Sequence, residues 1–245
     1  MALNPKYFCI SFHKTGTRSI HEFMLAAGLT AIHHPKDVNG VDWQRKLIPI
    51  RNSPGLIVDA LRPVIDAASV HADVPWAGIY GEIAAAYPDA KFILVKRDPA
   101  EWFKSISHHW SLDLLKHRMT PFEYIQYVPY FGPETGRLFG PRDRDLFIHA
   151  FTAHERNVQE RLPAERLLVF NLGQENSAKK LATFAGFSAI PAYPRIGIGK
   201  RKTSLQRLPK NILLRYRYAL DFRFPAIAGI FRAVLINPLW GQQQK

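Results

Sequence analysis

The residues best suited to do chemistry lie in a short loop that holds one lysine and one glycine. The loop reads Phe12-His13-Lys14-Thr15-Gly16-Thr17-Arg18-Ser19 and follows the apolar run 7–11. A helix is expected to begin at its end, and the N–H groups and dipole at a helix N-terminus favour a bound anion. Lys14 adds a full positive charge, and the hydroxyl groups of Thr17 and Ser19 add hydrogen-bond donors. The loop therefore predicts a phosphate-binding site.

The order of lysine and glycine separates this loop from a Walker A motif. In that motif, G-x-x-x-x-G-K-[ST], the lysine follows the second glycine. Here Lys14 precedes the single Gly16 by two residues. This order disfavours an ATP-dependent kinase of small molecules, which stays open only as a minor alternative.

A second polar motif follows another apolar run, at 91–96. Arg97 ends the run, Asp98 suits a helix N-cap and Pro99 suits the first helical turn. Ser105 lies eight residues after Arg97 and reaches the same anion only if the chain folds back. Two anion-binding motifs indicate a ligand with two separated anionic groups.

The elements that must position these motifs alternate between short β-prone runs and longer helical stretches. Strands are expected at 7–12, 29–33, 91–96 and 166–171, and helices at 17–27, 41–50, 56–67, 76–87, 99–115, 144–162 and 175–185. The β-prone runs are almost wholly apolar, as in parallel strands covered on both faces. The pattern predicts a three-layer α/β fold with a central parallel sheet, in which ligands bind beyond the carboxyl ends of the strands. The Pro- and Gly-rich stretch 129–141 is expected to form a loop or lid between helices.

The charge of the chain is concentrated in its last fifth. Residues 195–245 carry eleven Lys or Arg against one Asp, which leaves only +3 of the net charge of +13 to the first 194 residues. We therefore expect an α/β domain over 1–200 and a basic, amphipathic helical appendage over 201–245. Within that appendage, Pro225, Arg232 and Pro238 interrupt the apolar run 224–241, so a surface-lying segment is expected and not a membrane span.

Composition also indicates the expected cellular location of the protein and the kinds of partner it contacts. The basic segment indicates contact with an anionic membrane surface or a polyanion, and no nucleic-acid partner is expected. Residues 1–6 lack an apolar signal region, and the single Cys9 allows no internal disulfide. A cytoplasmic location is therefore expected, with peripheral contact at a membrane.

The ordered set of motifs resembles the sulfotransferases that use 3′-phosphoadenosine 5′-phosphosulfate (PAPS). The loop around Lys14 is similar to their 5′-phosphosulfate loop, and Arg97 to Ser105 is similar to their 3′-phosphate motif. A branch of that family also shows the stretches Asp73-Val74-Pro75-Trp76 and Ala86-Tyr87-Pro88-Asp89-Ala90-Lys91. The resemblance covers about residues 6 to 200 and implies a P-loop-like fold.

The resemblance implies roles for particular residues. The 5′-phosphosulfate would be held by Lys14, Thr15, Gly16, Thr17, Arg18 and Ser19, and the 3′-phosphate by Arg97 and Ser105. Lys200 and Arg201 would close over the 3′-phosphate. This family needs no metal, so none is expected. His13 stands where the similar branch often has proline, so no role transfers to it.

The general base is the residue for which the sequence leaves most alternatives. Relatives place a histidine or a carboxylate about two dozen residues before the arginine of the second motif. Asp73 lies 24 residues before Arg97 and is the favoured candidate, with His71, His33 and His34 as alternatives. The implied reaction is in-line transfer of a sulfuryl group, with Lys14 neutralising the leaving oxygen.

The acceptor is expected to be a hydroxyl-bearing small molecule, glycolipid or saccharide, or an amine. The alternative from another class is a non-catalytic module that binds a nucleotide or a membrane and keeps the same fold.

Overall fold

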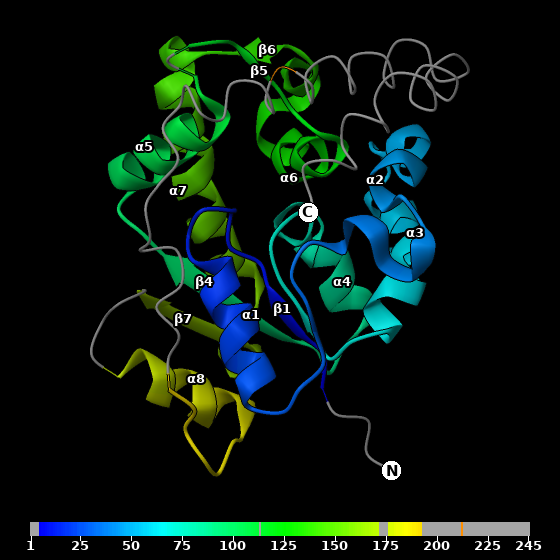
Figure 1. Ribbon diagram of the computed structural model, residues 1–245, viewed down its shortest axis with the longest axis vertical. Coiled ribbons are helices and arrows are strands. Elements are labelled where there is room, and N and C mark those ends of the chain that lie inside the picture. The colour runs from blue at the N-terminus through cyan, green and yellow to red at the C-terminus, as the bar shows by residue number, and fades with distance from the viewer. Residues whose placement is uncertain (1–4, 113, 172–175, 193–211, 213–245) are drawn as a thin grey trace, which may run out of the picture.

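A five-stranded parallel sheet forms the centre of the molecule (Figure 1). The computed structural model describes residues 5–112, 114–171, 176–192 and 212. The strand order is β2-β3-β1-β4-β7, and every neighbouring pair is parallel. The strands are β1 (Tyr7–Cys9), β2 (Ala31–Ile32), β3 (Val70–His71), β4 (Lys91–Lys96) and β7 (Leu167–Asn171).

Helices connect these strands and cover the sheet. The α-helices are α1 (Thr17–Ala26), α2 (Trp43–Lys46), α3 (Pro54–Asp66), α4 (Tyr80–Ala86), α5 (Pro99–Trp110), α6 (Pro121–Phe131), α7 (Arg144–Arg161) and α8 (Ser177–Ala185). Short 3₁₀ turns lie at Pro35–Gly40, Ile48–Ile50, Trp76–Gly78, Gly132–Gly136, Pro141–Asp143 and Ala164–Arg166.

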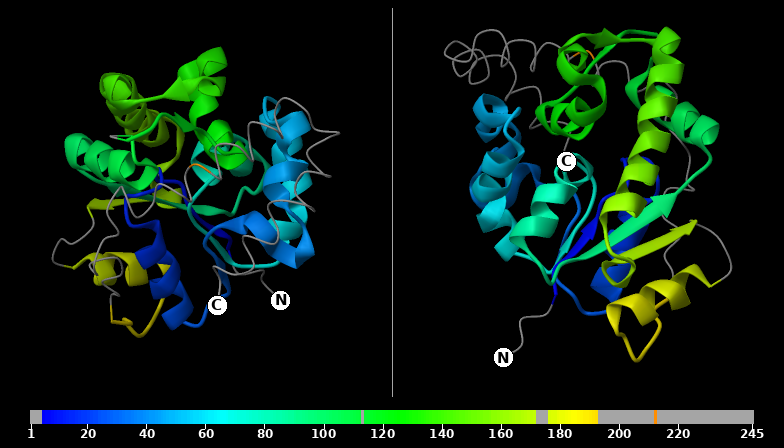
Figure 2. Two further views of the ribbon diagram at one scale, coloured as in Figure 1. Left: turned by 45° about the horizontal axis from the view of Figure 1, so that its top comes forward. Right: turned by 180° about the vertical axis from the view of Figure 1, so that it is seen from behind.

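The side chains of each strand alternate between the two faces of the sheet, which divides the core into two layers. Tyr7 and Cys9 pack with residues of α1 and α8, whereas Phe8 and Ile10 pack with residues of α3, α4 and α7. Successive strand side chains point to opposite faces, so one apolar run serves both layers. Figure 1 shows α1 and α8 on one face of the sheet, and Figure 2 shows α7 crossing the other. The result is a three-layer α/β/α sandwich.

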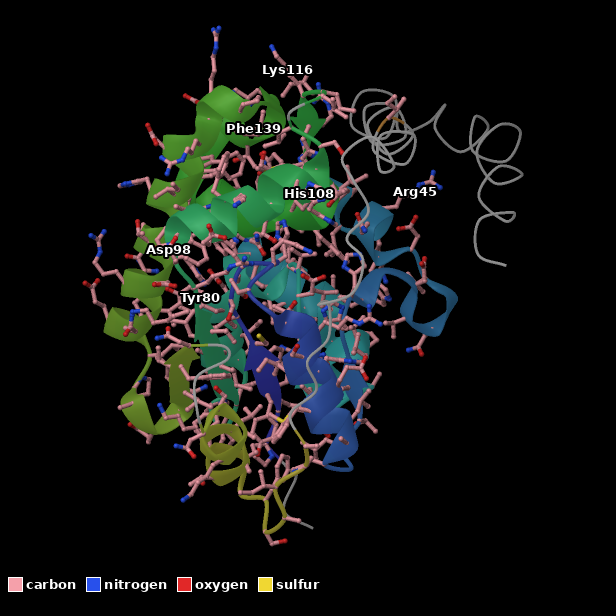
Figure 3. The ribbon with its side chains drawn as sticks, turned by 60° about the vertical axis from the view of Figure 1, so that its left-hand side comes forward. Arg45, Tyr80, Asp98, His108, Lys116 and Phe139 are labelled. Atoms are coloured by element: carbon pink, nitrogen blue, oxygen red, sulfur yellow. The ribbon has the colours of Figure 1, made fainter. Side chains whose placement is uncertain are left out.

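An aromatic cap covers the carboxyl end of the sheet. It comprises α5, α6, the amino-terminal half of α7 and the antiparallel pair β5 (His117–Arg118) and β6 (Leu138–Phe139). Phe12, which follows β1, joins this second core through ring contacts with Trp102 and Tyr127. Figure 3 labels Asp98 at the start of α5, and His108 and Phe139 within the cap. The cap is therefore built directly above the loop that follows β1.

The expected α/β class and central parallel sheet are confirmed, and the run 91–96 forms β4 with the expected bounds. The two-residue strands β3, β5 and β6 and the aromatic-rich helix α6 were not predicted. The stretch expected to be helical over 76–87 is divided into a 3₁₀ turn and α4. The expected loop at 129–141 is wrong in part, because α6 continues to Phe131 and β6 lies within it.

The basic segment 201–245 lies outside the described residues except at Ile212, and so does the expected boundary at residue 200. Within the part of the chain that the structure describes, no helix has the length and apolar character needed to cross a bilayer.

Candidate functional site

Polar residues follow four neighbouring strands at the same edge of the sheet. Lys14 lies in the loop after β1, Asp73 after β3, Arg97 after β4, and His33 with His34 after β2. These strands are parallel neighbours in the order β2-β3-β1-β4. Their carboxyl ends therefore gather residues that are far apart in the sequence into one site, at the edge where such sheets bind ligands.

The loop after β1 is built to present the N-terminus of α1. Lys14 and Gly16 both have positive φ, 71° and 101°, and Gly16 is the N-cap of α1. The Thr15 hydroxyl donates to the Phe12 carbonyl at 2.7 Å, which closes the turn from within. Since glycine has no side chain, no capping side chain occupies the N-terminal turn of α1, where N–H groups favour a bound anion.

The second motif holds this loop directly. Arg97 Nη1 donates to the Lys14 carbonyl at 2.6 Å, and Trp102 Nε1, on α5, donates to the His13 carbonyl at 3.0 Å. The two predicted anion-binding motifs are therefore in contact through a bond between Arg97 and the main chain of Lys14.

Other predicted ligands lie around the same two elements. Ser19 is buried in the first turn of α1, and Ser105 is half-buried on α5. Arg18 is exposed and lies 3.9 Å from the carboxylate of Glu22 on the same helix. Lys200 and Arg201 lie outside the described residues.

Asp73 is a carboxyl group in an environment that favours its neutral form. Its side chain is 18% exposed and its φ is 71°. Burial, and then the negative charge of Glu123, raise the pKa of Asp73 to about 7, while Lys14 and the Val74 N–H act in the opposite direction. A carboxylate with such a pKa can take up a proton near neutral pH, as a general base must.

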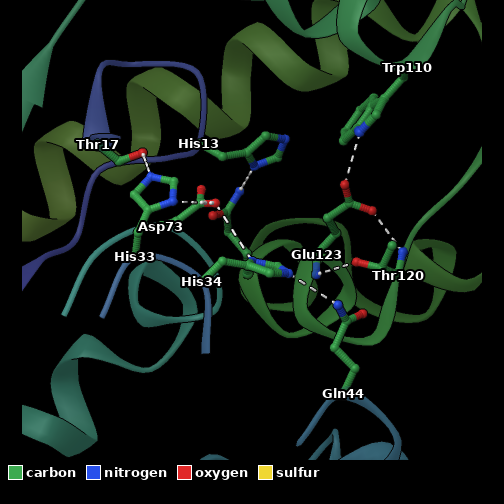
Figure 4. A network of polar contacts seen from close by, with 10 residues as sticks. His13, Thr17, His33, His34, Gln44, Asp73, Trp110, Thr120 and Glu123 are labelled. Carbon is green, nitrogen blue, oxygen red and sulfur yellow. Dashed lines mark hydrogen bonds and ion pairs between the residues drawn. The ribbon is translucent and has the colours of Figure 1, made fainter. Parts of the chain in front are cut away.

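Two histidines flank Asp73 (Figure 4). Asp73 Oδ2 lies 3.7 Å from His34 Nδ1 and 4.0 Å from His33 Nδ1. The second nitrogen of each ring faces another side chain. His33 Nε2 lies 3.2 Å from the Thr17 hydroxyl, and His34 Nε2 accepts a bond from Gln44 Nε2 at 3.2 Å. Burial lowers the pKa of His33 to about 4, so this imidazole is neutral at physiological pH.

His71, a third histidine considered as a base, points away from this group. It is fully buried, its Nε2 lies 3.1 Å from the carbonyls of Ile65 and Ala68, and its ring stacks on Phe8 at 4.9 Å. Burial lowers the pKa of His71 to about 4. The ring belongs to the core between the sheet and its covering helices.

His13 and Glu123 are polar residues of the site to which sequence reasoning gave no role. His13 is 6% exposed, and its Nδ1 accepts a bond from Gln126 Nε2 of α6 at 3.0 Å. Burial lowers the pKa of His13 to about 4. The only signal in the sequence was a histidine in place of the proline that the similar branch often carries.

Glu123 connects the cap to the site. Its carboxylate accepts bonds from Trp110 Nε1 at 2.9 Å and from the Thr120 N–H at 2.7 Å, and lies 3.1 Å from His117 Nε2. Burial alone would raise the pKa of Glu123, but pairing with His117 holds it well below its usual range. The sequence signal was a capping box, Thr120-x-x-Glu123, at the start of a helix that was not predicted.

Among the described residues, no group of three or more His, Cys, Asp and Glu side chains is arranged to hold a metal ion.

The structure is an α/β fold in which a glycine-capped loop follows the first strand and a mostly buried carboxyl group, that of Asp73, follows the neighbouring strand. Residues 6–199 match the family model described as a sulfotransferase domain. This match spans most of the chain, so the chain belongs to the sulfotransferase domain family.

Among solved structures, the chain is similar to a sulfotransferase from Alicyclobacillus acidocaldarius. The two are 15% identical over 90% of this chain and 93% of that one, with a TM-score of 0.49. No curated protein matches the chain at the level of sequence.

Proposed function

We propose that this chain transfers a sulfuryl group from PAPS to a hydroxyl group of an acceptor molecule, by in-line displacement. The observation that carries the proposal is the convergence of Lys14, Asp73 and Arg97 at the carboxyl ends of three adjacent strands in a member of the sulfotransferase family. It provides two cationic groups for a ligand with two anionic ends and a carboxylate to take up a proton.

The residues present fit PAPS. Gly16 in the left-handed region leaves the first turn of α1 open to the 5′-phosphosulfate, and Lys14 stands beside it. Arg97, a guanidinium one strand away, suits the 3′-phosphate, because arginine makes charge-assisted bonds to phosphate oxygens. PAPS supplies the activated sulfuryl group and an anionic leaving group.

The protein's own residues then act by position and charge. Lys14 and the N-terminus of α1 stabilise negative charge on the leaving oxygen, an electrostatic contribution that is large in sites shielded from water. Asp73 accepts the proton of the acceptor hydroxyl on a carboxylate oxygen. Such general-base assistance contributes roughly 10²–10⁴-fold to rate.

The acceptor is proposed to be a small molecule, glycolipid or saccharide with a free hydroxyl. We place the protein in the cytoplasm, with its basic segment 201–245 touching an anionic membrane surface or a polyanion.

Transfer of radiolabelled sulfur from PAPS to a panel of hydroxyl acceptors tests the activity, with Lys14→Ala and Arg97→Ala as paired variants. We expect Lys14→Ala to lower kcat far more than it lowers donor affinity. Arg97→Ala removes a charge-assisted bond and should weaken donor binding about 10- to 100-fold. Equal effects of the two variants on kcat and on affinity would contradict the assigned roles.

A further inference from the structure

One residue of the site connects its two functional parts, the anion-binding loop and the carboxyl group of Asp73. His33 follows β2, and its ring lies between Thr17 at the start of α1 and Asp73 after β3 (Figure 4). The Nε2 to Thr17 Oγ1 distance is 3.2 Å, and the Nδ1 to Asp73 Oδ2 distance is 4.0 Å. The side chains of His33 and Asp73 are only 28% and 18% exposed, so the ring is held with both nitrogens directed at named groups.

We propose that His33 is a positioning residue that couples the anion-binding loop to the candidate base, with Nε2–H donated to Thr17 Oγ1 and Nδ1 turned towards the Asp73 carboxyl group. This inference rests on the proposed function, since it deepens the roles given there to Thr17 and Asp73.

The tautomer follows from what the Thr17 hydroxyl must do. An anionic oxygen has no proton to give, so Thr17 binds it only by donating its own hydroxyl proton. The Thr17 oxygen is then free to accept a bond, and His33 Nε2–H is the donor placed 3.2 Å away. A neutral imidazole carries one ring proton, so His33 Nδ1 is left with a lone pair facing Asp73.

The lone pair on His33 Nδ1 favours the protonated form of Asp73. A carboxylate opposite a lone pair gains no hydrogen bond from it. A protonated carboxyl group can donate to His33 Nδ1 when its oxygen approaches this nitrogen or when one water bridges the two atoms. The effect grows as Asp73 takes up the acceptor's proton. His33 thereby makes Asp73 a stronger base at the moment of transfer, which is the stage that accelerates a reaction.

His34 acts in the opposite direction on the same carboxyl group. Gln44 donates to His34 Nε2, so the ring proton of neutral His34 is on Nδ1, 3.7 Å from Asp73. Other charged or titratable neighbours of Asp73 are Cys9 of β1, Lys14 in the loop, and Glu123 and Tyr127 on α6.

His33 itself is faced by His21 and Arg18 of α1, as well as by Lys14 and His34. These cations and imidazoles favour a neutral ring at position 33, which the proposed single-proton tautomer requires.

Two substitutions at position 33 distinguish the roles of the two ring nitrogens. A Gln side chain at position 33 reaches the place of Nε2, and an Asn side chain reaches the place of Nδ1. With 3′-phosphoadenosine 5′-phosphate as the probe, we expect His33→Gln to keep the wild-type Kd within about twofold and to shift the acidic limb of kcat/KM to lower pH. We expect His33→Asn to raise Kd about fivefold, as for one lost hydrogen bond. The acidic limb of its kcat/KM profile should stay at the wild-type pH.

Thr17→Val is the matched control, because it removes the hydroxyl at the other end of the same contact. It should raise Kd more than His33→Asn does, because it also removes the direct bond from Thr17 to the anion, and the double variant should bind no worse than Thr17→Val alone. Additive losses of affinity in the double variant would overturn the proposal. So would His33→Gln and His33→Asn behaving alike in both Kd and the pH of the acidic limb.

Nitrogen NMR of the full-length wild-type protein in saturating inorganic sulfate, which supplies an anion at the loop without donor or turnover, reads the His33 tautomer. A proton on Nε2 supports the proposal, and a proton on Nδ1 alone overturns it. Failure of the wild type to bind the nucleotide would contradict the proposed function instead, and the NMR result would still decide the arrangement at His33.

Discussion

Among single residues, Asp73 is the group proposed to take up the proton of the acceptor. Its pKa of about 7 means that the carboxylate needed for proton uptake predominates only above neutral pH. We expect kcat/KM to rise about tenfold per pH unit below pH 7 and to level off above it. A pH–rate profile of the wild type measures this limb, and a rate that is flat from pH 5 to 8 would rule Asp73 out.

The substitution Asp73→Asn tests the same role by removing the proton-accepting carboxylate. An amide cannot accept the proton, so kcat should fall roughly 10²–10⁴-fold while the affinity for the donor changes little. Asp59→Asn is a suitable control, since this exposed carboxylate pairs with Arg62 on α3. If Asp73→Asn retained wild-type turnover across the pH range, the base would have to be another group.

At the scale of elements, the close approach of α6 to the 3₁₀ turn Trp76–Gly78 fixes the cap over the sheet. A Cβ atom at Gly78 would overlap the Ile125 carbonyl and lie 2.7 Å from the Cα atom of Gln126. We expect Gly78→Ala to destabilise the protein by roughly 1–3 kcal/mol, because backbone has to move.

Gly81→Ala is the matched control for that prediction. Gly81 lies in α4, and a Cβ atom there meets nothing within 4 Å. Alanine should be neutral or stabilising by up to about 1 kcal/mol. Thermal unfolding of both variants tests the packing, and an equal Tm for the two would contradict it.

The Glu123 network ties the same helix to β5 and α5. Since the folded-state pKa of Glu123 is depressed, its stabilising contribution is complete above its unfolded pKa and is lost as pH falls towards the folded value. Glu123→Ala should cost roughly 3 kcal/mol, as for a broken buried pair. Glu134→Ala, which removes an exposed partner of Arg137, should cost under about 1 kcal/mol in the same denaturation series.

How far the sequence could predict these elements depends on the length of each signal. The six-residue apolar run of β4 and the loop from Lys14 to Ser19 could be recognised, because their patterns are local. The two-residue strand β3 could not, since only pairing with β1 and β2 makes it a strand. Likewise, α6 is buried around most of its circumference, so it lacks the polar face that identifies a surface helix.

The site was predicted in part for the same reason. Lys14, Asp73 and Arg97 stand at motifs that can be read along the chain, and the structure brings them to one edge of the sheet. The contacts of His13 and Glu123 depend on where α6 docks, which no local pattern shows.

At the scale of the whole molecule, the uneven charge predicts a second surface of contact. Residues 195–245 hold most of the net charge of +13. We expect deletion of 205–245 to reduce binding to vesicles containing phosphatidylserine at least severalfold, since each Lys or Arg near such a surface contributes about 1 kcal/mol. Vesicles of phosphatidylcholine alone and added salt are the controls. Unchanged sedimentation with anionic vesicles would show that the segment does not bind lipid.

In the proposed function, one ligand with two anionic ends binds across the loop at Lys14 and the guanidinium of Arg97. Calorimetric titration of the full-length protein with 3′-phosphoadenosine 5′-phosphate, 5′-AMP and ATP tests it most directly. We expect a strong preference for the nucleotide with the 3′-phosphate, and loss of that preference in Arg97→Ala. Equal binding of all three nucleotides, or no binding of the first, would contradict it.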